Sequence, residues 1–464
     1  MKDKENIVLD KRIVVCSIAI LVLLVFGISY AYFTAQDESG TQTITTAMLK
    51  LDFDDNTAII NAKDIKPITT DEVLTKAAKK TFTIKKFENS EDIYTKIELT
   101  NISMKDNSTG TASDDLAKYD LKWALYQGTD IKIATGDFGG KTSGNIVLAT
   151  NQLINSTTGT TYNLYIWINE TGLNQSSMMG QTLQAVISAS GTDEKQNTLA
   201  SVILGENNAN VLPGEYNEST DYTYDENIYG YRANYTPGLY AQQGDTIKSE
   251  MGFPTYYYRG NVTNNYVKFA DQTWRIVRIN EDGSIRLITE SAVGSSIWDS
   301  SEDTSYIIDY GKDTQRNSTI KTEVENWYNS RIGNNSNLDS KVVTSSFCND
   351  NIGKSHLTFV CPAGSINAYE KVGLITLDEA YYAGVYKTDV SIIPYFCNGS
   401  TNVFWTNTTS DNTVPRQVII DPYGFDLIYS SEQTVDIRAV INLSPDVIVT
   451  GGDGLSANTA YTIE

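Results

Sequence analysis

Histidine is almost absent, because the 464-residue sequence contains only His356. One imidazole cannot build a His-Glu-x-x-His zinc helix, a multi-histidine metal centre or a pair of imidazoles for acid–base catalysis. Cysteine is also scarce, with four residues and no Cys-x-x-Cys spacing, which argues against a cysteine-based zinc site. Since the sequence singles out no convergent set of titratable groups, we expect no enzyme.

Basic residues are outnumbered by acidic residues. The 36 Lys and Arg residues against 57 Asp and Glu give a net charge of −21 and a pI near 4.5. Proteins bind nucleic acids through clustered Lys and Arg that displace counterions from the phosphates. An acidic chain without a basic stripe lacks that footprint, so we exclude nucleic acid as a partner. The apolar content of 40% is enough for buried cores but too low for a multi-span membrane protein.

Long apolar runs are missing except near the N-terminus. Lys11 and Arg12 precede an apolar stretch at residues 13–26, and apolar residues continue to Phe33. Residues 13–33 meet the ~20 needed to cross a bilayer, whereas 13–26 alone fits the ~7–15 of a signal-peptide core. Ser29-Tyr30-Ala31 offers a small-x-small cleavage site, and we favour cleavage over an uncleaved anchor.

Residues 1–36 are therefore interpreted as a signal peptide or membrane anchor. Positive charge before the run, with an acidic remainder behind it, places the rest of the chain outside the cytoplasm. We expect a cell-surface or secreted protein in contact with the cell envelope or membrane. Its N-terminus stays cytoplasmic if the anchor is uncleaved.

Alternating apolar residues run from Met48 to Ala189. This period-two pattern is typical of half-buried strands, as in Leu121/Trp123/Leu125, Tyr162/Leu164/Ile166/Ile168 and Leu183/Ala185/Ile187/Ala189. Polar stretches rich in Gly, Ser, Thr and Asn separate the strands. Because no long helical pattern intervenes, we predict an antiparallel β-sandwich over residues 37–195.

The alternation lapses at residues 196–254, where tyrosines stand among Gly, Asn, Asp and Glu. We interpret this segment as a tyrosine-rich linker that packs against a neighbouring domain. Residues 255–464 predict an α+β domain that begins and ends in strand. Its signals are an Asp282-Gly283 hairpin turn, a helix from Ile320 towards Gly333, and a Thr376-x-x-Glu379 capping box. The whole chain is thus predicted to be mainly β, with two domains.

The N-terminal half resembles the TasA/camelysin family over roughly residues 13–192. The resemblance rests on the export segment that ends Tyr30-Ala31-Tyr32-Phe33-Thr34, the strand Met48-Leu49-Lys50-Leu51, and short motifs between Tyr165 and Ile187. These are exported proteins of Gram-positive bacteria with a jelly-roll-like sandwich, some of which build biofilm matrix fibres. The resemblance implies processing by a dedicated signal peptidase and, in fibre formers, insertion of the freed N-terminal strand into the next subunit.

The C-terminal half, about 255–464, resembles a recurrent, functionally uncharacterised module of Firmicute surface proteins. Its element order is also similar, to a lesser degree, to C-type-lectin-like domains. Neither resemblance supplies a site residue to transfer. The matching motifs are Tyr257-Tyr258-Arg259-Gly260, Trp274-Arg275-Ile276-Val277-Arg278, Phe347-Cys348-Asn349-Asp350, the run Gly373 to Ala380, Phe404-Trp405-Thr406, Arg438-Ala439-Val440-Ile441-Asn442-Leu443 and Gly452-Asp453-Gly454.

Cysteines and acidic loops supply the remaining candidate sites of the chain. Cys348 and Cys361 enclose a short loop and are the expected disulfide, which leaves Cys397 free or intermolecular. We expect no cofactor. Calcium is a subsidiary possibility at the acidic residues 52–56 and at the 451–454 turn, although neither has an EF-hand spacing.

Two further motifs are interpreted as structural. Residues 136–142 superficially resemble a phosphate-binding loop but miss its glycine spacing, so we interpret them as a solvent loop. Ser318-x-x-Lys321 matches one motif of penicillin-recognising enzymes without the others, and Ser318 is expected to cap a helix.

Two functions follow from these features. The first is a structural or adhesive role at the cell surface or in the biofilm matrix, with self-assembly through the polar strand at residues 41–46, or with that strand folding back on its own domain. The second is a lectin-like protein that binds carbohydrate or a host protein. Trp298, Trp405, Tyr382 and Tyr386 are the candidate ligand-contact aromatics, and their exposure would distinguish the two functions.

Overall fold

The computed structural model describes residues 33–35, 49–53, 59–63, 66–106, 109, 121–139, 144–170, 172, 175, 181–211, 237–241, 250–300, 307–309, 315–348, 359, 366–385, 394–397, 403–409, 416–422, 424–429 and 433–463. Across these residues the chain is mainly β, as predicted. No helix within them is long and apolar enough to cross a membrane. The apolar run at residues 13–26 lies outside the described residues.

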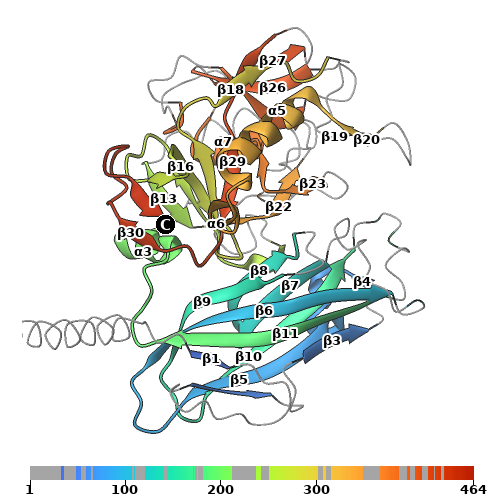
Figure 1. Cartoon of the computed structure of the whole chain (residues 1–464), viewed down its shortest axis with the longest axis vertical. Coiled ribbons are helices and arrows are strands. Elements are labelled where there is room, and N and C mark those ends of the chain that lie inside the picture. Colours follow the sequence, from blue (N-terminus) through green and yellow to red (C-terminus); the bar gives the residue numbers. More distant parts are fainter. Residues whose placement is uncertain are drawn as a thin grey trace, which may run out of the picture.

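Two sheets form the N-terminal part, which we define as the described residues up to Thr192 (Figure 1). Their pairing is antiparallel except between β4 and β10. The β11 sheet contains β1 (Phe33–Ala35), β3 (Ile59–Lys63), β6 (Ile93–Asp106), β9 (Ile146–Ile154) and β11 (Gln181–Thr192). The β10 sheet contains β2 (Leu49–Phe53), β4 (Pro67–Ile68), β5 (Ala78–Lys86), β7 (Leu121–Gln127), β8 (Ile131–Asp137) and β10 (Thr160–Asn169).

The alternating apolar residues meet in one core between these sheets. Leu121, Trp123 and Leu125 of β7 join Leu183 and its alternate neighbours of β11 in a single buried cluster. Successive side chains of a strand point to opposite faces, so the period-two pattern fixes which face of each strand is buried.

The outer face of the β10 sheet is also covered. Tyr126 and Trp167 point away from the main core and pack with Phe253, which follows η5 (Glu250–Gly252). Tyr126 lies edge-on to Phe253 with 5.4 Å between ring centroids. The short helices η1 (Thr70–Glu72) and α2 (Val73–Lys76) contribute Val73 to the same cluster.

The C-terminal part, defined as the described residues from Thr198 onward, is built on two further sheets (Figure 1). The β16 sheet contains β12 (Asn210–Val211), β13 (Gly238–Ala241), β14 (Tyr256–Arg259), β15 (Tyr266–Phe269), β16 (Gln272–Ile279), β17 (Ile285–Thr289), β21 (Val342–Val343), β24 (Val372–Gly373), β29 (Val440–Leu443), β30 (Val449–Gly451) and β31 (Tyr461–Ile463). The β26 sheet contains β18 (Gly294–Ser296), β25 (Phe404–Thr409), β26 (Arg416–Asp421), β27 (Gly424–Tyr429) and β28 (Val435–Ile437).

Two hairpins and several helices complete this part. The hairpins pair β19 (Ile307–Asp309) with β20 (Gln315–Asn317), and β22 (Ser345–Cys348) with β23 (Ile366–Glu370). The helices are α3 (Leu199–Glu206), α5 (Thr319–Tyr328), the π-helical turn η6 (Asn329–Gly333), α6 (Ser336–Asp339) and α7 (Leu377–Ala383). The Asp282-Gly283 turn joins β16 to β17 as predicted, and Ser318 caps α5 by accepting from the Lys321 N–H at 3.2 Å.

Helix α7 is buried along its whole length, so its backbone ends need partners inside the protein. At the N-terminus, Thr376 and Glu379 form the predicted capping box. At the C-terminus, the Arg259 guanidinium donates to the carbonyls of Tyr381 and Tyr382 at 3.1 and 2.9 Å. Gly384 then ends the helix at φ 108°, a conformation that favours glycine.

The chain crosses between the two parts through residues 193–198. Asn151 of β9 holds the crossing, because its side chain exchanges two hydrogen bonds with the backbone of Gln196 at 2.8 and 2.9 Å. The expected linker at 196–254 is partly core instead, since Leu199, Ile203 and Tyr240 belong to the hydrophobic cluster of the C-terminal part. The available signal was the i, i+4 spacing of Leu199 and Ile203, which places both side chains on one face of α3.

Candidate functional site

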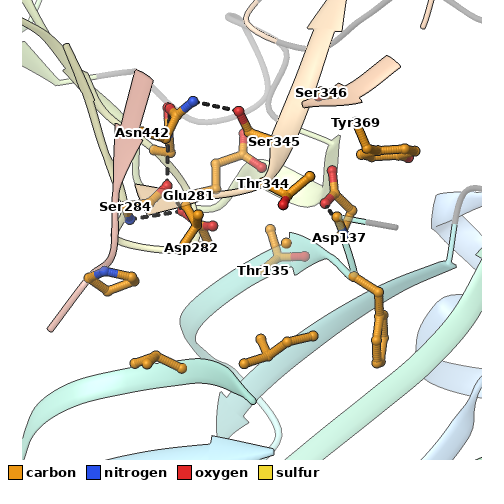
Figure 2. A pocket seen from close by; sticks show the side chains of 18 of the residues that line it. Thr135, Asp137, Glu281, Asp282, Ser284, Thr344, Ser345, Ser346, Tyr369 and Asn442 are labelled. Atoms are coloured by element: carbon orange, nitrogen blue, oxygen red, sulfur yellow. Dashed lines mark hydrogen bonds between the residues drawn. The ribbon is translucent and has the colours of Figure 1, made fainter. Parts of the chain in front are cut away.

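A cleft of about 700 Å³ lies where the two parts meet. Strand β8 and the start of β9 line it from the N-terminal part, and the β16–β17 turn, β21, β22 and β23 line it from the C-terminal part. Figure 2 shows Thr135 and Asp137 on one side of this space, with Glu281, Asp282 and Thr344 on the other. We name this space the interpart cleft.

Strand β8 builds the N-terminal wall. The Thr135 hydroxyl donates to the Trp123 carbonyl at 2.6 Å, and its backbone N–H donates to the Glu281 carbonyl at 3.2 Å across the boundary. Asp137 accepts from the Gly139 N–H at 2.7 Å. These bonds fix the end of β8 against the C-terminal part.

Glycine allows the two parts to approach each other at this wall. A Cβ on Gly136 would lie 3.0 Å from Asp282 Cβ, and one on Gly139 would lie 2.7 Å from the Thr344 carbonyl oxygen. Residues 136–139 are therefore an interpart contact rather than the solvent loop that we expected, and Phe138 is buried in the N-terminal core. The Gly-Asp-Phe-Gly run was the available signal, because paired glycines around a buried aromatic residue can mark close backbone approach.

The C-terminal wall is a hydrogen-bonded chain of small polar side chains. Asp282 accepts from the Ser284 N–H at 2.8 Å and from its hydroxyl, and Asn280 donates to Ser284 Oγ at 2.8 Å. Asn280 also donates to Asn442 Oδ1 at 2.9 Å, and the buried Asn442 donates to Ser345 (Figure 2). Asn280 Oδ1 itself is buried without a hydrogen-bond partner. The wall is thus rigid, with one acceptor unsatisfied.

Two arginines line the cleft with their charges already paired. Glu379 of α7 lies 3.2 Å from Arg278 Nε and 2.5 Å from Arg286 Nε. Burial lowers the pKa of Arg286 to about 10 although the Glu379 carboxylate opposes that shift. The same carboxylate accepts from the Thr376 N–H at 3.0 Å, so one buried anion serves two cations and a helix cap. These guanidinium groups are structural, and the single Glu379 carboxylate compensates part of their positive charge.

The acidic side chains that line the cleft differ in their burial and in their hydrogen-bond and ion-pair partners. Asp282 is half-buried, and burial raises the pKa of its carboxyl even though the Ser284 hydrogen bonds lower it. Glu98, Asp137, Glu170, Glu281 and Asp446 also line the cleft. Lys371, a basic residue of the rim, lies 2.6 Å from Asp339 Oδ2. The cleft is therefore acidic to neutral in character.

A second ion pair closes another side of the boundary. Lys96 of β6 lies 3.1 Å from Asp446 and 3.0 Å from Glu98. Burial lowers the pKa of Lys96, but the two carboxylates outweigh that effect and the pKa is raised overall. Lys96 therefore stays protonated and joins the N-terminal part to the segment that follows β29.

The expected ligand-contact aromatics are not at a surface. Trp298 and Trp405 are 0% exposed and Tyr382 is 2% exposed, all within the core of the C-terminal part. The two indoles pack edge-on at 5.7 Å, and Trp405 Nε1 donates to the Ser296 carbonyl at 2.8 Å. These positions do not support the expected contact role, because burial of a large ring in a core is the commoner use of tryptophan. Tyr386 lies outside the described residues.

Cys348 and Cys397 are the two cysteines within the described residues. Cys348 is disulfide-bonded, whereas Cys397 is a free and buried thiol. Burial raises the pKa of Cys397 to about 12, partly offset by the nearby Arg438. Cys361 lies outside the described residues, so its pairing with Cys348 stays a prediction.

The calcium hypothesis gains no site. Within the described ranges, no group of three or more His, Cys, Asp or Glu residues is arranged to hold a metal ion. Asp453 instead accepts from the Leu455 N–H at 3.0 Å in the 451–454 turn. Gly452 in that turn has φ 83°, as expected for a glycine-dependent turn. Residues 54–56 of the other acidic loop lie outside the described residues.

Tyr369 of β23 is an aromatic residue of the cleft that sequence reasoning missed. Its ring is half-buried and lies on the rim beside Ser346 (Figure 2).

Comparison of the chain with protein-family models and with curated proteins found no match. The function must therefore be argued from the residues and their geometry.

Proposed function

We propose that this chain is an exported protein of the cell envelope with a structural or adhesive role, as a surface or biofilm matrix component. In this proposal the two N-terminal sheets are the jelly-roll-like sandwich of a TasA/camelysin-like protein. The C-terminal part is the α+β surface module that the sandwich presents. The apolar segment that begins at residue 13 supplies export or anchoring, and it ends before Phe33, which lies in strand β1.

One observation carries the proposal, namely that the motif residues of the C-terminal part serve its fold. Arg275 donates to the Asn265 side chain and to the Val262 carbonyl, both at 2.7 Å, and stacks 3.9 Å from the Tyr266 ring centroid. Arg438 donates to the Thr289 carbonyl at 2.8 Å. A module whose distinctive charged and aromatic residues hold its interior together is suited to display and durability rather than to catalysis.

The pairing of strand β1, near the N-terminus, is relevant to self-assembly of the protein. Strand β1 pairs with residues 189–191 of β11, and β3 pairs with residues 182–186 along the same edge. An edge covered by its own chain is protected from pairing with a neighbour. This supports the alternative in which the N-terminal segment folds back on its own domain. Residues 41–46, proposed to mediate self-assembly, lie outside the described residues.

The test is to fractionate cells that express the native protein and to determine its N-terminus by mass spectrometry. We expect the protein in the envelope or medium, with an N-terminus near Tyr32. A variant with Ala31→Leu should keep the intact N-terminus in the membrane fraction if cleavage follows Ala31. An intact protein confined to the cytosol would contradict the proposal.

The alternative is a lectin-like ligand-binding protein. The interpart cleft favours it, because half-buried polar side chains from both parts line that cleft. The aromatic residues first expected to bind ligand do not favour it. The two functions are compatible if the adhesive role acts through the cleft.

A further inference from the structure

We propose that the interpart cleft binds a neutral, polyhydroxylated ligand, namely an oligosaccharide of a few sugar units. This inference rests on the proposed adhesive function and names the ligand class and the place where it binds. The cleft is distinct from the buried aromatic cluster around Trp298 and Trp405.

The size of the cleft fits such a ligand. Pockets that bind small molecules usually enclose about 300–1,000 Å³, and this cleft measures about 700 Å³. Its walls come from two separate cores, so a ligand inside it contacts both parts of the chain. Its binding would add a connection between the two parts.

The polar groups of the cleft match hydroxyl groups. A sugar hydroxyl both donates and accepts, and it therefore needs donors and acceptors side by side. Thr344 and Ser346 line the cleft with half-buried hydroxyl groups, which both donate and accept. The half-buried carboxylates of Asp137, Glu281 and Asp282 add acceptors. Ser284 and Asn442 are buried and hydrogen-bonded to Asn280, so they make the wall rigid rather than contact a ligand.

Charge disfavours ionic ligands. Arg278 and Arg286 share the single Glu379 carboxylate, Lys371 is paired with Asp339, and Lys122 also lines the cleft. The lining carboxylates, those of Glu98, Asp137, Glu170, Glu281, Asp282 and Asp446, outnumber these four basic groups even when Lys96, which pairs with Glu98 and Asp446, is counted with them. The excess of negative charge would repel a phosphate, sulfate or uronate. A metal ion is disfavoured as well, because no three-ligand cluster occurs among the described residues. An uncharged hydroxyl group donates a hydrogen bond to a carboxylate without these penalties.

An aromatic rim completes the arrangement. Tyr369 is half-buried on β23, at the edge of the cleft that Ser346 also lines. An aromatic face packs well on the apolar C–H face of a sugar ring, and such aromatic contacts are worth about 0.5–1.5 kcal/mol beyond the area they bury. Tyr369 is thus placed to contact one sugar while the Glu281 and Asp282 carboxylates accept from the hydroxyl groups of another.

The experiment applies the full chain in detergent to an array of neutral, sialylated, sulfated and amine-bearing oligosaccharides. Isothermal titration calorimetry with the best-bound neutral glycan then gives its affinity. We expect binding to neutral glycans only. Tyr369→Ala should weaken it about tenfold, which corresponds to the upper end of an aromatic contact, and Tyr369→Phe should retain most of it. Glu281→Gln should also weaken binding, whereas Glu88→Gln, an equal charge change at an exposed site outside the cleft, should not.

Three outcomes would overturn the inference: no neutral glycan bound, a preference for charged glycans, or equal affinity in Tyr369→Ala, Glu281→Gln and the wild type. Circular dichroism and thermal unfolding of each variant show whether a lost affinity reflects lost folding, and Glu281→Gln keeps the test valid if Tyr369→Ala unfolds. Surface location is measured separately by fractionation. A protein that reaches the envelope and binds no glycan therefore refutes this inference alone, whereas a cytosolic protein refutes the proposed function.

Discussion

Gly139→Ala tests whether the two parts are held together where β8 ends. Gly139 has φ +55°, and an added Cβ would lie 2.7 Å from the Thr344 carbonyl oxygen of the C-terminal part. A backbone oxygen cannot rotate away as a side chain can. The two parts must therefore separate locally, which strains the adjacent hydrogen bond from the Thr135 N–H to the Glu281 carbonyl.

Gly128→Ala is the matched control. Gly128 has φ +64° in the β7–β8 turn, and an added Cβ there meets nothing within 4 Å. Both variants carry the cost of a left-handed alanine, about 1–2 kcal/mol. Only Gly139→Ala also weakens the interpart hydrogen bond, worth about 0.5–1.5 kcal/mol. We therefore expect Gly139→Ala to be less stable than Gly128→Ala by about that smaller amount.

Urea unfolding measures the difference in the free energy of unfolding, and hydrogen exchange of the peptide that contains Thr135 locates it. The Thr135 amide should exchange about 2–12-fold faster in Gly139→Ala than in Gly128→Ala, which is the same free energy expressed as an opening equilibrium. Equal stabilities together with equal exchange at Thr135 would refute the argument that glycine enables the interpart contact.

Three other predictions concern charge and covalent links. Asp446→Asn should lower the free energy of unfolding by up to about 1 kcal/mol near neutral pH, a small effect because Lys96 and Asp446 are partly exposed. The pKa of Lys96 is raised in the folded protein, so the ion pair contributes fully below about pH 10.4. Its contribution is lost as the pH rises further and Lys96 loses its proton. In thermal unfolding between pH 8 and 11, the difference in stability between the wild type and the variant should therefore shrink as the pH rises. A difference that stays constant over this range would contradict the prediction. Glu379→Gln should lower the free energy of unfolding in urea by about 3–5 kcal/mol, because the buried Arg286 and the half-buried Arg278 lose their shared carboxylate. The exposed Glu323→Gln should change it little, and equal effects would count against the pairing. Peptide mapping without reduction should join Cys348 to Cys361, a link worth about 2–4 kcal/mol, and a bridge from Cys397 would contradict it.

Local patterns predicted the elements well, because their causes lie within a few residues. Alternation placed the strands of the N-terminal core, and the Thr376–Glu379 spacing identified the cap of α7. These features depend on side-chain direction and on hydrogen bonds that close within one turn. The same reasoning could not reveal the interpart cleft. Thr135 and Glu281 meet across a boundary between parts that fold around separate cores.

Aromatic residues were misjudged for a related reason. A tryptophan in an exported module is compatible with ligand contact or with core packing, and the local sequence around Trp298 and Trp405 does not distinguish them. Burial is decided by distant strands, here by the β18 carbonyl of Ser296 that accepts from Trp405 Nε1. Tyr369, which does reach the cleft, lies on a short hairpin strand with no pattern to mark it.

Four arginines of the C-terminal part are buried. Arg259, Arg275, Arg286 and Arg438 are each 1–2% exposed, so their guanidinium groups cannot contact a ligand at the surface. Their charge still counts in the net charge of −21, which sets the sign of the field around the protein. That field repels an anionic polymer, whereas a neutral ligand meets no such barrier. This repulsion thus selects for uncharged ligands at the interpart cleft.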